Sequence, residues 1–260
     1  IETSGSSSAI VKSLVDKTIF EEYYIAQDRV SFDKEDDSQF TLSEAQQLAF
    51  DSIQENFKNF DVNLLHGVTA SGKTEIYIKL LEQYIKEGKQ VLFLLPEIAL
   101  TTQLVQRLTA YFGNEVAVFH SKYTNNERIE VWNQVLENSP KAKVVIGVRS
   151  ALFLPFSDLG CIIVDEEHEQ TFKQNDPSPR YHARDAAIVL AKQHGAKVVL
   201  GSATPSLETY YNVQSNKYGL TELKVRYGNV VLPEIKLVDL KDKYFRKKMS
   251  GHFSDELLEE

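Results

Sequence analysis

Residues 67–74 have the residue types and the spacing of a loop that binds phosphate. Gly67 and Gly72 enclose four residues and are followed at once by Lys73 and Thr74. The glycines permit backbone angles that a Cβ resists, so the N–H groups of the loop can point inward at an anion. Lys73 can reach the β- and γ-phosphates of a nucleotide, and the Thr74 hydroxyl can bind Mg²⁺. A chance glycine-rich turn is the alternative. The residues expected to bind nucleotide are Gly67, Val68, Thr69, Ala70, Ser71, Gly72, Lys73 and Thr74.

A second group of reactive side chains, Asp165-Glu166-Glu167-His168, ends an apolar run. Asp165 is placed to hold Mg²⁺, directly or through water, on the opposite side from Thr74. Glu166 is placed to orient or deprotonate an attacking water, and hydrolysis needs both functions. An acidic cluster after a strand can also be a solvated loop, and Glu167 is the least informative of the three acids. The presence of a phosphate loop in the same chain favours a site that hydrolyses nucleotides.

The segment Gly201-Ser202-Ala203-Thr204-Pro205 is a third loop that directly follows an apolar run. The hydroxyl groups of Ser202 and Thr204 can sense whether a γ-phosphate is present. Thr204 before Pro205 is equally an N-cap pattern, which would make the segment a helix start. The spacing alone does not choose between these two interpretations.

Each of the three segments follows an apolar run typical of a buried strand, and helical patterns alternate with the strands. This alternation predicts an α/β fold, with a mainly parallel sheet, right-handed crossovers and helices on both faces. Ligands of such sheets bind beyond the carboxyl ends of the strands, so all three segments are expected at one edge. Another helix opens after Thr41 or Ser43, either of which can cap it. Further strands are expected at 91–95, 116–119, 144–148, 161–164 and 197–200, and helices at 73–87, 97–112, 126–137, 183–194 and 205–213.

The composition is that of a globular chain, with 260 residues of which 42% are hydrophobic. No apolar run approaches the ~20 residues of a membrane span, and residues 1–10 do not have the pattern of a signal peptide. The single cysteine, Cys161, permits no internal disulfide and no Cys-based metal site; it fits a strand core and a reducing cytoplasm.

The net charge of −8 argues against a chain that coats nucleic acid by bulk charge. Residues 16–61 hold 12 acidic and 4 basic residues, so the remainder is neutral overall.

The N-terminal part differs from the centre of the chain. Residues 9–17 have the pattern of a short amphipathic helix, and residues 18–32 are β-rich. This order is typical of the end of a winged-helix domain at 1–33, and an N-terminal arm that packs on the main domain is the alternative. Residues 34–40 are expected to form an acidic linker.

A nucleotide-binding domain is expected at 41–219, followed by a connector at 220–260. Strand-like segments begin the connector, and residues 241–248 form a basic run. This run is either solvated or a minor contact to nucleic acid. Residues 253–260 have the pattern of a helix.

Three strings in one chain carry a resemblance to a known family, namely residues 67–75, 165–168 and 201–206. Together they resemble motifs I, II and III of the superfamily 2 helicases. More specifically, the chain resembles the PriA family of bacterial primosomal replication-restart helicases from about residue 41 to 213, and more weakly toward both ends. Ala70 departs from the glycine common in that family, and we expect its Cβ to be tolerated. Further similar segments are 95–103, His120-Ser121 with Glu127, Arg128 and Trp132, 147–153 and 179–185.

The resemblance implies a RecA-like P-loop NTPase lobe, the first of two in a motor that uses ATP and Mg²⁺. Such a motor translocates 3′ to 5′ on single-stranded or forked DNA. The resemblance also implies that Gln46 contacts the adenine edge. The residues it implies for catalysis are Lys73, Asp165, Glu166 and His168, and those it implies for coupling in motif III are Gly201, Ser202, Ala203 and Thr204.

The resemblance further implies that the loop after motif II, residues 170–181, couples DNA contact to hydrolysis. Aromatic faces stack on bases and cations meet phosphates, which makes Phe172, Lys173, Arg180 and Tyr181 candidates for DNA binding. A surface loop whose path is fixed by prolines is the alternative. Arg149 and Ser150, after a strand, can contact the DNA backbone, or Arg149 can be a structural salt-bridge partner.

The resemblance also sets expectations about the rest of a longer protein. A second motor lobe with an arginine finger and a zinc module with Cys clusters are expected outside this chain, so that zinc belongs only to the missing C-terminal part. The fragment alone is therefore expected to bind ATP and to hydrolyse it poorly. Primosome proteins and single-stranded-DNA-binding proteins are implied partners, in the bacterial cytoplasm and without a membrane. The alternatives are a P-loop kinase or metabolic ATPase unrelated to DNA, and a module that binds nucleotide without turnover.

Overall fold

The predicted alternation of strands and helices is confirmed by the computed structural model, which describes residues 41–96, 102–120, 123–226 and 237–259. Within the described residues, the central part forms a seven-stranded sheet in the order β3-β4-β2-β5-β8-β1-β9, and all neighbouring strands are parallel. The predictions for 1–33 and 34–40, and for the start of the helix at 97–112, lie outside the described residues. The strands are β1 (Val62–Gly67), β2 (Gln90–Leu94), β3 (Val116–Phe119), β4 (Val144–Gly147), β5 (Leu159–Asp165), β8 (Lys197–Ser202) and β9 (Gly219–Leu223).

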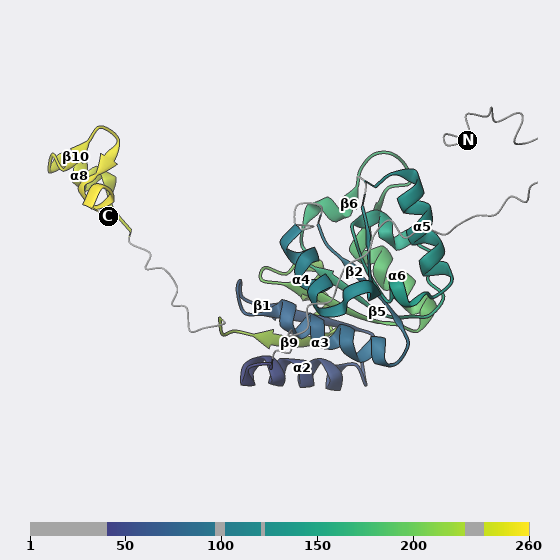
Figure 1. The fold of residues 1–260 in the computed structure, drawn as a ribbon. Coiled ribbons are helices and arrows are strands. Elements are labelled where there is room, and N and C mark those ends of the chain that lie inside the picture. The colour runs from purple at the N-terminus through teal and green to yellow at the C-terminus, as the bar shows by residue number, and fades with distance from the viewer. Residues whose placement is uncertain (1–40, 97–101, 121–122, 227–236, 260) are drawn as a thin grey trace, which may run out of the picture.

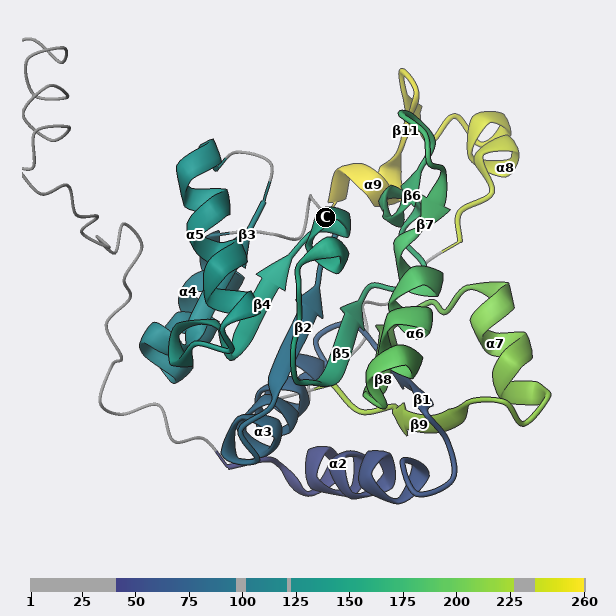
Figure 2. The ribbon, with the colours of Figure 1, turned by 90° about the vertical axis from the view of Figure 1, so that its right-hand side faces the viewer.

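Helices cover both faces of this sheet, as Figure 1 and Figure 2 show. Alternate strand residues point to opposite faces. Leu92 and Leu94 of β2 belong to the hydrophobic cluster that includes α5 and α6, whereas Val91 and Phe93 belong to the cluster that includes α2, α3 and α4. Because both faces are covered, the strands are nearly continuous apolar runs. The helices are α2 (Glu44–Asn56), α3 (Lys73–Lys86), α4 (Thr102–Phe112), α5 (Asn125–Leu136), α6 (Ala183–His194) and α7 (Leu207–Gln214), with short 3₁₀ turns η1 (Gly113–Glu115), η2 (Pro140–Ala142), η3 (Arg149–Phe153) and η4 (Gln170–Phe172).

The strand register brings the three predicted loops to one edge. β8 lies between β5 and β1, with Gly201 opposite Asp165 and Ser202 opposite His66. The carboxyl ends of these three strands are therefore level with one another. As a result, the phosphate loop, the acidic segment and the Gly201–Thr204 segment emerge side by side, where ligands of such sheets bind.

Local signals set the ends of several helices. Ser43, and not Thr41, caps α2 in a capping box: its hydroxyl accepts from the Gln46 N–H, and the Gln46 side chain accepts from the Ser43 N–H. The interpretation of Thr204 as a helix cap is wrong. α7 begins at Leu207, and the Ser206 hydroxyl accepts from the Thr209 N–H.

β9 extends the sheet past the domain boundary predicted at 219. It pairs with β1 from Asn63–Gly219 to Gly67–Leu223, and the Val68 N–H donates to the Leu223 carbonyl at 3.2 Å. The sheet domain therefore continues through Leu223, and the predicted boundary falls inside a strand. The strand-like pattern after residue 219 was visible in the sequence, but its partner β1 lies far away along the chain.

A small C-terminal unit holds α8 (Leu240–Phe245), β10 (Met249–Ser250), β11 (Phe253–Ser254) and α9 (Asp255–Glu259). The predicted helix from residue 253 starts only at Asp255, because Phe253–Ser254 pairs with β10 as an antiparallel strand. Lys243 of the basic run forms ion pairs with Asp255 and Glu256. These hydrogen bonds to carboxylates raise the pKa of Lys243.

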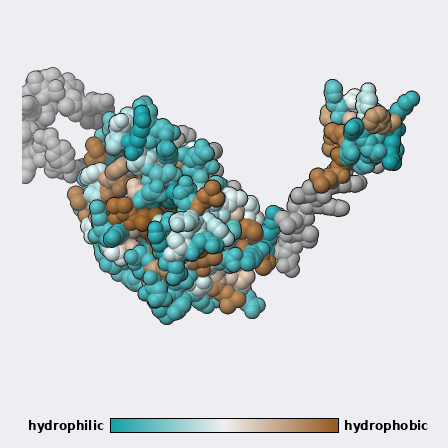
Figure 3. Space-filling model, turned by 180° about the vertical axis from the view of Figure 1, so that it is seen from behind, coloured by the Kyte–Doolittle hydropathy of each residue, from teal (hydrophilic) through white to brown (hydrophobic). Residues whose placement is uncertain are grey.

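The surface of the sheet domain is mixed in character. Figure 3 shows apolar side chains gathered in patches among hydrophilic ones on one face. Ile129, Trp132 and Phe153 are among the large apolar side chains that remain exposed, at 57%, 44% and 58%. Among the helices of the described residues, none combines the length and the apolar character needed to cross a membrane.

Candidate functional site

The phosphate loop lies between β1 and α3, as its residue types predict. β1 ends at Gly67, and α3 begins at Lys73 with Gly72 as its N-cap at φ 85°. A Cβ on Gly72 would lie 2.1 Å from Nε2 of Gln46, so glycine is required there for its backbone angle and for space. Ala70 also adopts a left-handed φ of 59°. Glycine adopts such a φ without the cost that a Cβ brings, so the conformation suits the glycine that the resemblance led us to expect there.

The loop and the acidic segment line one cavity of about 340 Å³. Lys73 and Thr74 come from the start of α3, while Asp165 and Glu166 come from the end of β5. Sequence reasoning brought these four side chains together, and the structure places them around one space. The other lining residues are Thr69, Ala70, Ser71, Gly72, Glu75 and Arg107.

The residues of the loop fit a bound polyphosphate. The Ser71 hydroxyl is buried without a hydrogen-bond partner in the described structure, and the first-turn N–H groups of α3 have no intrahelical acceptors. The Lys73 ammonium donates to the Gly67 carbonyl at 3.0 Å, which keeps it beside the loop. Among the described residues, no group of three or more His, Cys, Asp or Glu side chains could hold a metal ion. Mg²⁺ here would be bound by a carboxylate, a hydroxyl and phosphate oxygens, as is usual for this ion.

Asp165 is held by a residue that the sequence did not single out. The hydroxyl of the fully buried Tyr77 donates to Oδ1 of Asp165 at 2.9 Å. Burial and the neighbouring Glu166 raise the pKa of Asp165 to about 6, while the Tyr77 hydrogen bond and Lys73 act in the opposite direction. Tyr77 also packs edge-on against Phe93, with ring centroids 5.5 Å apart. The hydrogen bond from Tyr77 therefore fixes the orientation of the Asp165 carboxylate.

His168 lies against the Gly201–Thr204 segment, and its Nδ1 is 3.7 Å from a carboxylate oxygen of Glu166. Glu166 has a left-handed φ of 49°, a conformation that non-glycine residues adopt at an energetic cost and that clusters at functional sites. Nδ1 of His168 is 2.8 Å from the Ser202 hydroxyl, and its Nε2 is 3.4 Å from the Thr204 hydroxyl. The Thr204 N–H donates to the Ser202 hydroxyl at 3.0 Å. The acidic segment and the third loop are thus joined by side chains.

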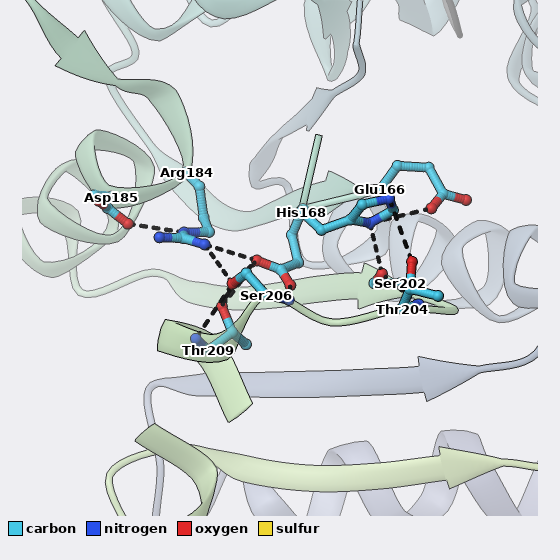
Figure 4. Close-up of polar contacts among 9 residues, drawn as sticks. Glu166, His168, Arg184, Asp185, Ser202, Thr204, Ser206 and Thr209 are labelled. Carbon is cyan, nitrogen blue, oxygen red and sulfur yellow. Dashed lines mark hydrogen bonds and ion pairs between the residues drawn. The ribbon is translucent and has the colours of Figure 1, made fainter. Parts of the chain in front are cut away.

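Glu167, which the sequence ranked as least informative, is the most completely bonded of the three acids. It is fully buried, and three of its hydrogen-bond partners, Arg184, Ser206 and Thr209, lie close together in Figure 4. Arg184 donates to Oε2 at 3.0 Å, as do the hydroxyls of Ser206 at 3.0 Å and Thr209 at 2.8 Å. The Ser206 N–H donates to Oε1 at 2.7 Å. Glu167 therefore ties β5 to α6 and to the start of α7.

Gln46 and Arg107 approach the phosphate loop from other helices. Gln46 is buried, and its Nε2 donates to the Gly72 carbonyl at 3.3 Å, so its side chain touches the backbone of the loop. Arg107 of α4 lines the cavity and pairs with Glu75 of α3. No sequence pattern marked Arg107, because only the packing of α4 on α3 brings it there.

The segment after the acidic residues forms a short hairpin of β6 (Lys173–Gln174) and β7 (Tyr181–His182). The prediction that Phe172 stacks on DNA bases is wrong for this structure, because Phe172 is 0% exposed within the core. Lys173 and Arg180 are exposed, and their contact with DNA phosphates stays a prediction.

Tyr181 and Arg149 connect this hairpin to η3. The Tyr181 ring contacts Phe153, with centroids 5.3 Å apart. Arg149 donates to the Lys173 carbonyl at 3.0 Å, a structural contact but not a salt bridge. Ser150 is half-buried beside it. The predicted DNA contacts other than Phe172 therefore form one connected region.

Comparison with known proteins agrees with this geometry. The family model described as DEAD/DEAH box helicase matches residues 43–213. The replication restart protein PriA of Bacillus subtilis is 42% identical over 98% of this chain, and PriA of Haemophilus influenzae is 44% identical over 94% of it. This chain spans only 32% and 34% of the length of those relatives.

Solved structures show the same fold at low sequence identity. RecG bound to a three-way DNA junction is similar over 84% of this chain and 26% of its own, with a TM-score of 0.51 and 18% identity. The Escherichia coli DExH-box NTPase HrpB is similar over 72% of this chain and 22% of its own, with a TM-score of 0.50 and 12% identity. These similarities support a RecA-like helicase fold. Since the family model covers more than half of the residues, this chain belongs to the DEAD/DEAH box helicase family.

Proposed function

We propose that this chain is the ATP-binding first motor lobe of a DNA helicase that acts in replication restart, moving 3′ to 5′ on single-stranded DNA at forks. The observation that carries the proposal is the shared cavity, which Lys73 and Thr74 line from one side and Asp165 and Glu166 from the other. Similarity to PriA proteins over most of the chain supports DNA as the substrate.

The side chains of the cavity suit hydrolysis of ATP. Mg²⁺, when bound, neutralises charge on the β- and γ-phosphates; Thr74 and Asp165 are the residues to hold it. Lys73 contributes an ammonium to the same oxygens. Glu166 orients the attacking water or takes its proton. Gln46, already in contact with the loop backbone, contacts the adenine.

The third loop links the cavity to DNA. His168 bonds to Ser202 and Thr204, so a change at the γ-phosphate that moves Glu166 or His168 also moves this loop. The hairpin after the acidic segment carries Lys173 and Arg180, which bind DNA phosphates in this proposal. Phosphoryl transfer thereby becomes coupled to movement on the strand.

In this proposal, the remaining parts of the motor belong to a longer protein of which this chain is one portion. An arginine finger from a second lobe contributes about 10³–10⁵ in rate in related systems, so this chain alone should bind ATP but hydrolyse it slowly. Zinc belongs to that other part. Primosome proteins and single-stranded-DNA-binding proteins are the proposed partners, in the cytoplasm of a bacterium.

Two binding titrations test the proposal. Calorimetry with Mg·ATP should show binding to the wild-type chain and its loss in Lys73→Ala, while Lys58→Ala, at an exposed lysine just after the end of α2, leaves it unchanged. Fluorescence anisotropy of a labelled oligothymidylate should show binding of single-stranded DNA. A chain that binds ATP but no DNA, with or without nucleotide, would point to a kinase or a metabolic ATPase and would remove the motor proposal. Brisk turnover by these 260 residues alone would contradict the need for a second lobe.

A further inference from the structure

An apolar groove lies away from the nucleotide cavity, at the ends of β3 and β4. Its volume is about 540 Å³, within the range of roughly 300–1,000 Å³ typical of small-molecule sites. α5 contributes Arg128, Ile129 and Trp132, and η3 contributes Ser150 and Phe153. β3 and β4 are neighbours in the parallel sheet, so the groove opens at the same carboxyl edge as the predicted ATP site.

The lining has the character of a site for an aromatic ring with an attached anion. Trp132 and Phe153 are 44% and 58% exposed, so both aromatic side chains remain accessible from the solvent. The Arg128 guanidinium lies 5.5 Å from the centre of the Phe119 ring, in a cation–π contact at the groove. Among the described residues that line the groove, none is acidic. Glu127, which follows the start of α5, is directed to the backbone and hydroxyl of Thr124 as a helix cap.

The groove is continuous with the cationic hairpin. Phe153 of the groove wall contacts Tyr181, and Arg149, next to Ser150, donates to the Lys173 carbonyl. Lys173 and Arg180 of the hairpin are exposed. An apolar segment of a partner protein would gain little from these cations, whereas a nucleotide matches both the ring faces and the charge.

We infer that this groove binds one unpaired base of single-stranded nucleic acid, stacked on Trp132, while Arg128 and the hairpin cations face the adjoining phosphates. This inference rests on the proposed function, because it specifies where the DNA of that function places a base. The base-binding groove would lie beside the hairpin that follows Asp165–His168. Occupancy of the groove is thereby positioned to affect that hairpin through Phe153 and Arg149.

The chain contains its own reporter, since Trp132 is its only tryptophan. A base stacked on indole quenches its emission, so oligothymidylate should quench the fluorescence of the wild-type chain. An abasic strand of equal length has the same phosphates without bases and should leave the emission nearly unchanged. Trp132→Ala should weaken oligothymidylate binding about 5- to 150-fold, the range for loss of one base–aromatic stack, and Trp132→Phe should retain most of it.

Tyr211→Ala provides the matched control, because Tyr211 is an exposed aromatic of α7 outside the groove. Its DNA affinity should equal that of the wild type. Binding of the strand without quenching, or equal quenching by the abasic strand, would overturn the inference and leave the proposed function standing. In that case the groove would be a surface for a protein partner. Absence of DNA binding in the anisotropy titration would overturn both.

Discussion

Replacing Arg184 by methionine should destabilise the sheet domain far more than breaking a surface ion pair. The Glu167 carboxylate is 0% exposed, and the Arg184 side chain is 8% exposed. Methionine keeps much of the volume of Arg184 but removes the only cation bonded to Glu167 within the described residues. The donors that remain, Ser206 and Thr209, are neutral.

The size of the expected loss in stability follows from this geometry. Removing one partner of a buried ion pair leaves an uncompensated charge, which costs about 3–5 kcal/mol. A domain of this size loses roughly 2–4 °C in Tm per kcal/mol, so the Tm should fall by about 6–20 °C. Loss of the bond from Arg184 to Asp185 adds little, because Asp185 is 61% exposed.

Urea unfolding followed by the emission of Trp132 measures the free energy of unfolding of the sheet domain. Lys58→Met serves as the control, because the Lys58–Glu55 pair is 68% and 66% exposed and should contribute no more than about 1 kcal/mol. Adding Glu167→Gln to Arg184→Met should recover part of the loss, since the buried charge is then removed. If Arg184→Met costs no more than Lys58→Met, the argument from the buried carboxylate is refuted.

Three further outcomes follow from the site. Gly201→Ala should lower the free energy of unfolding by at least about 1–3 kcal/mol, because its Cβ would lie 1.7 Å from the Tyr77 hydroxyl. Gly195→Ala is the control, because a Cβ there would lie in open space and would be opposed only by the positive φ of the backbone. It should lower the free energy of unfolding by about 1 kcal/mol in the same urea titration. Cys161, whose pKa is raised by complete burial, should not react with a thiol reagent until the chain unfolds, as absorbance of the released product would show. Asp165→Asn should abolish the gain in ATP affinity on adding Mg²⁺, measured by calorimetry with and without the ion.

Each of these outcomes has a clear opposite. Equal losses for the two glycine variants would mean that Tyr77 moves aside freely. Rapid labelling of Cys161 in the native chain would show that β5 opens without global unfolding. An unchanged Mg²⁺ effect in Asp165→Asn would mean that the ion is held elsewhere.

Much of the fold could be predicted from the sequence because its signals are local. The strand at Val116–Phe119 and the helix at Ala183–His194 match their predicted bounds, since apolar runs and helical periodicity act over a few neighbouring residues. The phosphate loop was recognisable for the same reason, as Gly67 to Thr74 lie in one contiguous stretch between a strand and a helix. These features depend on backbone preferences that neighbouring residues already express.

Contacts between residues far apart in the chain were decided only by the tertiary structure. Tyr77 occupies an ordinary helical position in the sequence, and only the packing of α3 on the sheet places its hydroxyl against Asp165. Nothing in the sequence distinguished Glu167 from a solvated acid, and only strand register and the path of α6 surround it with donors. Phe172 had the character of a surface aromatic, yet the hairpin turns it into the core. The sequence determined which segments form strands, helices and loops, whereas packing and register determined which side chains meet, because those distances depend on the whole fold.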